Sequence, residues 1–186
     1  MYRSIGSHGT SKSRVDSISR NGFRESAFGR RGKGVYFWYA DECGCEDARN
    51  LARSWYKYAE RRGEYKSDEN KQGQVIWAKI GCEQENLLKL TEPKYRATIR
   101  KLVESHIEDA QKKGEVISND EAMSLAHDMF ISRLSSKHPI DVVLATVAAP
   151  KKMKDELLPF LGEPFAHIVK NMSCITMFPA LTEDIK

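Results

Sequence analysis

Residues 28–39, which read FGRRGKGVYFWY, join a basic glycine loop to an apolar run. The run from Val35 to Tyr39 consists of β-branched and aromatic residues, a composition that predicts a strand. Glycines beside arginines let a backbone approach a phosphate group while cations neutralise it. We therefore expect a strand whose entrance loop, with Arg30 and Arg31, faces a phosphate-bearing ligand; a solvated loop is the alternative reading.

On both sides of this stretch, the chain alternates short β-strand patterns with helical ones. Strands are expected at 2–8, 74–80, 87–90, 140–148 and, as one or two strands, 167–177. Helices are expected around 15–21, over 45–62, 94–113 and 119–134, and from Pro150 through 161, with 63–73 as a loop. This order predicts a single α+β domain over 1–186, in which 94–134 is a helical insertion.

The basic charge is concentrated at the start of the chain. Residues 1–33 contain 8 Lys/Arg and 2 Asp/Glu, a net charge of +6, whereas the whole chain carries +4. A local basic surface suits a phosphate-bearing ligand or a nucleic acid. A solvated basic face explains the same charges equally well, so charge alone does not choose a function.

The composition excludes several classes of protein. With 40% apolar and 30% charged residues in 186, the chain has the profile of a globular domain. No run approaches the roughly 18 apolar residues of a membrane span, and the first residues lack the apolar segment of a secretory signal. The four cysteines, with only Cys43 and Cys45 close together, lack zinc-hook spacing. We expect reduced thiols, no metal site, no membrane partner and a cytoplasmic location.

The segment His8-Gly9-Thr10 is a second candidate ligand site. Glycine lets a ligand approach the backbone, and the histidine beside it can donate a hydrogen bond to a ribose hydroxyl. A histidine next to a glycine is more often structural. Tyr36 offers an aromatic face for stacking, although tyrosines in strands mostly belong to the core.

The combination of His8-Gly-Thr, Asn21-Gly-Phe and Gly34-Val-Tyr36-Phe is more specific than its parts. It resembles the ADP-ribosyltransferases of the diphtheria-toxin and poly(ADP-ribose) polymerase type. The His8–Tyr36 spacing of 28 residues fits that family. The short motifs cover about residues 2–40 and 163–178. The resemblance implies a split β-sheet core with flanking helices, and NAD as a substrate.

The resemblance also implies roles for individual residues. His8 would bind the adenosine ribose, with Thr10 completing its motif, and backbone groups of Gly9 would hold the nicotinamide amide. Tyr36 would stack on the nicotinamide, while Arg30 and Arg31 would face the diphosphate.

A second aromatic side chain, Tyr56 or Trp55, would complete the clamp on the nicotinamide ring. Core packing is the alternative for both aromatics, and we favour it for Trp55.

The chain departs from the family at the third signature position. A glutamate commonly opens a late strand there and faces the positive charge that develops on the ribose. Here Ala166 opens the comparable stretch AHIVKN. The alignment is shifted so that Glu163 does the work, or the protein is a weak relative, or a Glu→Ala change has inactivated it. We favour the third, expect little activity, and read His167, on the opposite strand face, as structural.

The resemblance thus implies an NAD-dependent mono-ADP-ribosyltransferase as the leading function. Because compact single domains of that family are often bacterial toxins or phage-defence effectors, we expect such a role here. Its acceptor would be RNA, favoured by the basic segment, or a protein, and an antitoxin or immunity partner would restrain it. An RNA 2′-phosphotransferase-like enzyme and a non-catalytic NAD- or nucleic-acid-binding module are the alternatives.

Overall fold

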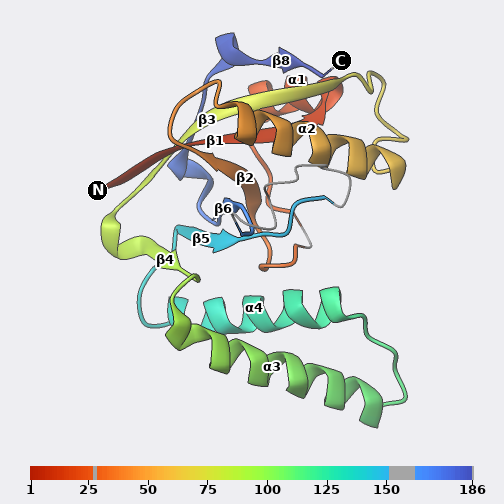
Figure 1. Cartoon of the computed structure of the whole chain (residues 1–186), viewed down its shortest axis with the longest axis vertical. Coiled ribbons are helices and arrows are strands. Elements are labelled where there is room, and N and C mark those ends of the chain that lie inside the picture. The colour runs from red at the N-terminus through yellow and green to blue at the C-terminus, as the bar shows by residue number, and fades with distance from the viewer. Residues whose placement is uncertain (27–28, 151–161, 186) are drawn as a thin grey trace.

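The structure is a computed structural model that describes residues 1–26, 29–150 and 162–185 (Figure 1). Within them the strands form one mixed 8-stranded sheet in the order β4-β5-β6-β2-β1-β3-β7, with β8 beside β3. The strands are β1 Tyr2–Ser11, β2 Val35–Ala40, β3 Gly73–Cys82, β4 Leu87–Lys89, β5 Val142–Thr146, β6 Phe165–Val169, β7 Ile175–Met177 and β8 Glu183–Asp184. The predicted α+β class is confirmed.

The long helices lie close to their expected ranges. They are α1 Lys12–Asn21, α2 Glu46–Arg61, α3 Pro93–Lys112 and α4 Asn119–Ser135. Ser118 caps α4, because its Oγ accepts from the backbone N–H of Glu121 at 3.2 Å. The helix expected from Pro150 lies almost wholly outside the described residues. The prediction that the chain closes with a strand at Met177 is wrong, since β8 follows.

Helices cover both ends of one sheet face. Ala166 of β6 packs in a cluster with Trp38 and the α2 side chains, whereas Ile168 packs with Phe130 of α4. Residues two apart in a strand point to the same face, so α2 and α4 lie over one face at different ends. Figure 1 shows α2 above the middle strands and α3 with α4 below them. The opposite face carries a separate cluster that includes Phe37 and Val169.

The helices α3 and α4 connect two neighbouring strands. β4 and β5 pair in parallel, from Leu87 opposite Val142 to Lys89 opposite Leu144. A parallel pair needs a crossover connection, and the two helices provide it. None of the helices in the described parts of the chain is both long and apolar enough to span a lipid bilayer.

The strands β1 and β2 separate halfway along. Their ladder runs only from Ile5–Ala40 to Ser7–Trp38, while β1 continues along β3 to Ser11. Along its other edge β2 pairs with β6, from Val35–Val169 to Trp38–Ala166. The sheet therefore splits locally between β1 and β2. The split separates the part of β1 from His8 onward from the part of β2 up to Phe37.

Candidate functional site

The basic loop folds back over Tyr36. The Tyr36 hydroxyl donates to the Gly32 carbonyl at 2.6 Å and accepts from the Arg31 backbone N–H at 3.0 Å. The loop lies so close that a Cβ atom at Gly29 would be 2.4 Å from the Tyr36 hydroxyl oxygen. Burial raises the pKa of Tyr36 above its ordinary value, so the phenol stays neutral. Tyr36 thus fixes the shape of the loop, and the loop covers one side of the Tyr36 ring.

The same loop is fastened to α4. The Lys33 backbone N–H donates to Asp128 Oδ1 at 2.8 Å. Lys170, which follows β6, lies 3.5 Å from the same carboxylate and donates to the Lys33 carbonyl. Burial lowers the pKa of Lys170, an effect that the nearby Asp128 carboxylate opposes. One aspartate therefore joins the loop, α4 and the end of β6.

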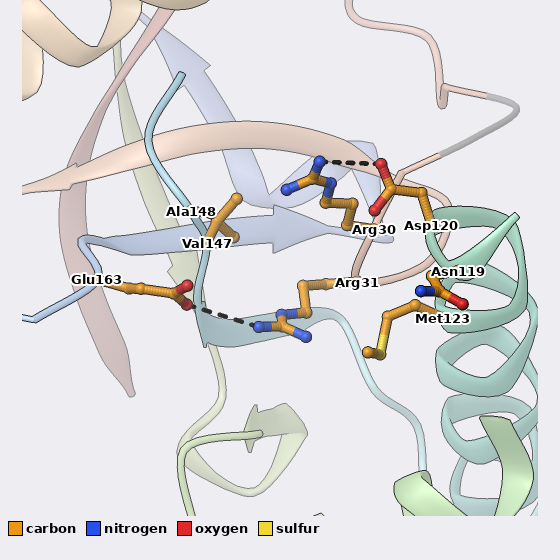
Figure 2. A pocket seen from close by; sticks show the side chains of 8 residues that line it. All are labelled: Arg30, Arg31, Asn119, Asp120, Met123, Val147, Ala148 and Glu163. Carbon is orange, nitrogen blue, oxygen red and sulfur yellow. Dashed lines mark hydrogen bonds and ion pairs between the residues drawn. The ribbon is translucent and has the colours of Figure 1, made fainter. Parts of the chain in front are cut away.

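A cavity of about 170 Å³ lies between this loop, the start of α4 and the chain that leaves β5 (Figure 2). Both of its cations are paired, Arg30 with Asp120 at 2.9 Å and Arg31 with Glu163 at 3.8 Å. Arg31 Nε also donates to the Thr146 carbonyl at 2.9 Å. The cavity is lined by Arg30, Arg31, Asn119, Asp120, Met123, Val147, Ala148 and Glu163.

The cavity suits a small anion that displaces the Asp120 and Glu163 carboxylates from Arg30 and Arg31. Two guanidinium groups and the positive end of the α4 dipole converge on it. Small-molecule sites usually measure about 300–1,000 Å³, so the cavity holds part of a nucleotide but not a dinucleotide. A ligand of that size has to extend beyond the cavity or displace the loop.

His8 lies at the split but not in this cavity. Its Nδ1 is 2.9 Å from the Tyr36 carbonyl oxygen, across the place where β1 and β2 separate. Its ring packs on Phe37 at 5.7 Å and Phe23 at 5.9 Å, on the sheet face opposite the Tyr36 side chain. Desolvation lowers the pKa of His8 and favours the neutral ring.

Gly9 and Thr10 have structural partners that the sequence did not reveal. A Cβ atom at Gly9 would lie 1.9 Å from the Ala52 carbonyl oxygen, so the glycine lets α2 sit directly on β1. Thr10 is buried, and its hydroxyl interacts with the phenol of Tyr65. These contacts account for both residues without a ligand, and their predicted binding roles stay predictions.

The two candidate clamp aromatics lie on different sides of α2. Tyr56 is buried, donates to the Lys71 carbonyl at the start of β3, and stacks on Tyr65 at 5.2 Å. It belongs to the core and is not in the cavity. Trp55, for which we favoured core packing, is instead 37% exposed, so that expectation is wrong. Of the two, only Trp55 presents aromatic surface to a partner.

The two candidate positions for the carboxylate differ in burial. Ala166 is opposite Trp38 in the ladder and 1% exposed, with its methyl group on the same face as Tyr36. Glu163 is half-exposed and lines the cavity. His167 points to the opposite face, as expected, where Tyr2 Oη lies 2.8 Å from its Nε2. Its predicted structural role is confirmed by complete burial.

The acidic residues of α4 were missed in the sequence. Asp120 stood at the start of the helix expected over 119–134, and Asp128 stood in an ordinary polar position of that helix. The only available signal was that a loop with several cations requires counter-charges. Nothing in the spacing says that a helix about 90 residues later supplies them.

Comparison with protein-family models and with curated proteins finds no match to this chain. Among the described residues, no three histidine, cysteine, aspartate or glutamate side chains gather where they could hold a metal ion. All four cysteines are free thiols. The site's own residues therefore have to carry any functional argument.

Proposed function

We propose that this chain is an NAD-dependent mono-ADP-ribosyltransferase whose site lies at the split between β1 and β2. One observation supports it above the others. The β2–β6 register sets Tyr36 opposite Ile168 and Trp38 opposite Ala166. Position 166, where the resemblance expects a carboxylate, is thereby a diagonal neighbour of Tyr36 on the same face, within reach of long side chains.

The proposed reaction needs few groups. The bond between ribose C1′ and the nicotinamide nitrogen breaks, and its electron pair leaves with the neutral nicotinamide. An acceptor nucleophile bonds to C1′ and releases a proton to solvent. In this scheme Arg30 and Arg31 exchange Asp120 and Glu163 for the diphosphate, and Tyr36 holds the loop that carries them. The adenosine ribose would have to reach His8 through the split, because the His8 ring lies on the sheet face opposite Tyr36.

The printed chain lacks a carboxylate at the position that matters most in this scheme. A methyl group at 166 cannot stabilise the oxocarbenium-like ribose of the transition state. Glu163 lines the cavity and is half-exposed, whereas position 166 is the diagonal neighbour of Tyr36. We therefore propose that Ala166 replaces a catalytic glutamate and that the chain, as printed, binds NAD but transfers ADP-ribose slowly.

A non-catalytic NAD-binding module is the second candidate, and the burial of Ala166 in an apolar cluster favours it. An RNA 2′-phosphotransferase-like activity has no such observation in its support. Toxin or phage-defence activity, an inhibitory antitoxin partner and action in the cytoplasm remain proposals that rest on the resemblance alone.

Calorimetric titration with NAD tests the site. Tyr36→Ala removes the side chain that anchors the loop, and we expect NAD affinity to fall at least about tenfold, equivalent to 1.4 kcal/mol. Tyr95→Ala is the matched control, because both tyrosines are partly buried against the same core cluster. Tyr95→Ala should bind NAD normally. Equal binding by Tyr36→Ala, or absence of NAD binding by the unaltered chain, contradicts the proposal.

A further inference from the structure

A row of neighbouring aromatic and cationic side chains runs along one side of α2. Trp55 and Tyr58 have ring centroids 5.6 Å apart at an interplanar angle of 37°. The Arg62 guanidinium carbon lies 5.6 Å from the Tyr58 centroid, and its Nη1 donates to the Tyr58 hydroxyl at 2.9 Å. We call these three residues the aromatic row. Each is three or four positions from the next, so they share a helix side.

Trp55 is the exposed ring of the aromatic row, and Tyr58 is half-buried. Trp55 is 37% exposed, whereas Trp38 is 7% and Trp77 is 0% exposed. The Arg62 side chain is 63% exposed. An arginine held over the Tyr58 ring, next to the exposed Trp55, is a preformed surface, because the hydrogen bond to Tyr58 already restricts its rotamer.

The aromatic row lies on a helix that covers the same sheet face as the candidate site. Tyr56, on the other side of α2, contacts the beginning of β3, so the row faces away from that edge. The hydrogen bond with Tyr58 raises the pKa of Arg62. α2 and α4, which borders the cavity, cover this face at different ends (Figure 1).

The charge around the aromatic row is mainly positive. Residues 53–64 contain 4 Lys/Arg and 2 Asp/Glu. Of the two acids, Glu60 accepts a hydrogen bond from Tyr56 at 2.8 Å, and Glu64 lies 4.0 Å from Arg62. An exposed ring flanked by cations suits a single-stranded nucleic acid, because every base has a stackable face and every nucleotide a phosphate. An apolar protein partner would desolvate these cations without supplying a counter-charge.

We propose that the aromatic row is a stacking platform for single-stranded nucleic acid, with bases on Trp55 and Tyr58 and a phosphate at Arg62. Binding depends only on these groups. The further step, that the bound strand is the acceptor of ADP-ribose, rests on the proposed function.

The test uses the full chain without NAD and a fluorescein-labelled ten-nucleotide oligo(U), with oligo(dT) and a duplex of equal length as comparison arms. Fluorescence anisotropy of the labelled strand gives the affinity. Quenching of tryptophan fluorescence reports binding at Trp55, because the other two tryptophans are buried. We expect the single strands to bind and quench. Tyr58→Ala and Trp55→Ala should weaken binding at least about fivefold. Arg62→Ala should also reduce the salt dependence by about one phosphate contact.

Two control variants match these changes at the far end of the same face. Leu125→Ala removes another exposed apolar side chain, and Arg100→Ala another exposed helical arginine, paired with Glu104. Both should bind as the unaltered chain does. Thermal unfolding of every variant separates lost contacts from lost structure, and Tyr58→Phe, which keeps the ring, should retain most of the affinity.

The proposal is overturned if no single strand binds at low salt, if the duplex binds equally well, or if the row variants bind like the controls. It is also overturned if Trp55→Ala weakens NAD binding alone, because the ring would then belong to the nicotinamide clamp. The oligonucleotide test contains no NAD, so it can be interpreted even if the chain does not bind NAD. The two proposals can therefore fail independently.

Discussion

The two ends of one sheet face are built by different forces. At the α2 end, alanines and a glycine bring helix and strand into direct contact, with Ala52 completely buried. At the α4 end, a cationic loop is held by carboxylates, with Asp128 on Lys33 and Asp120 on Arg30. Apolar contacts fix the first end rigidly, while anions can compete for the second. The cavity proposed for the diphosphate therefore lies where the sheet is held by exchangeable contacts.

The largest expected effect strikes the rigid end. Gly9→Ala places a Cβ atom 1.9 Å from the Ala52 carbonyl oxygen, so α2 has to move off the sheet. We expect the free energy of unfolding to fall by about 3 kcal/mol or more. Gly81→Ala is the control, because its nearest atom would be 3.5 Å away. Urea unfolding measures both, and equal stability of the two variants would contradict the close packing of α2.

Acid should weaken the α4 end through His127. Burial lowers the pKa of this side chain to about 4 from 6.5. Because the folded pKa is the lower one, this stability is complete above pH 6.5 and is lost as the pH falls toward 4, by as much as about 3 kcal/mol. His127→Gln should unfold with a flatter pH dependence, while the exposed His138→Gln should keep the original slope. Parallel slopes for both variants would refute this assignment.

Removing the shared aspartate should loosen the loop without unfolding the protein. Asp128→Ala deprives the Lys33 N–H and the half-buried Lys170 of a partner, which costs about 1–3 kcal/mol. Faster hydrogen exchange in residues 29–34 should accompany the loss. Asp109→Ala, whose partner Lys112 is exposed, should change neither quantity. If exchange in the loop stays slow, Asp128 does not hold it.

The smallest change concerns the hydroxyl of Tyr36. Tyr36→Phe keeps the ring but removes the hydrogen bonds with Gly32 and Arg31, so stability should fall by about 1 kcal/mol. NAD affinity should fall less than in Tyr36→Ala, because the aromatic face remains. A Phe variant that binds as weakly as the Ala variant would show that loop anchoring, not the ring, matters for NAD.

Local patterns in the sequence predicted the α+β class and most of the helices and strands. Helical periodicity and runs of β-branched and aromatic residues depend only on residues that are close in the sequence. The helix over 119–134 and the strand after the glycine loop are examples. Long-range partners were not predictable in this way. The contact of Gly9 with Ala52 and the pairing of Arg30 with Asp120 join segments 43 and 90 residues apart in the numbering.

The burial of the two adjacent aromatics could not be assigned from the sequence either. Trp55 and Tyr56 differ by one helical step, and the sequence pattern placed both on the apolar side. The structure puts Tyr56 against Gly73 at the start of β3 and leaves Trp55 exposed.

Transfer of labelled ADP-ribose from NAD tests the central claim most directly. The unaltered chain, Ala166→Glu, Glu163→Ala and the double variant are each incubated with labelled NAD and separate RNA, DNA and protein pools. We predict that Ala166→Glu raises transfer at least about 100-fold, although burying a carboxylate beside Trp38 lowers its melting temperature. Transfer should persist in the double variant. Strong transfer by the unaltered chain that disappears in Glu163→Ala, or no gain with Ala166→Glu despite bound NAD, would contradict the account.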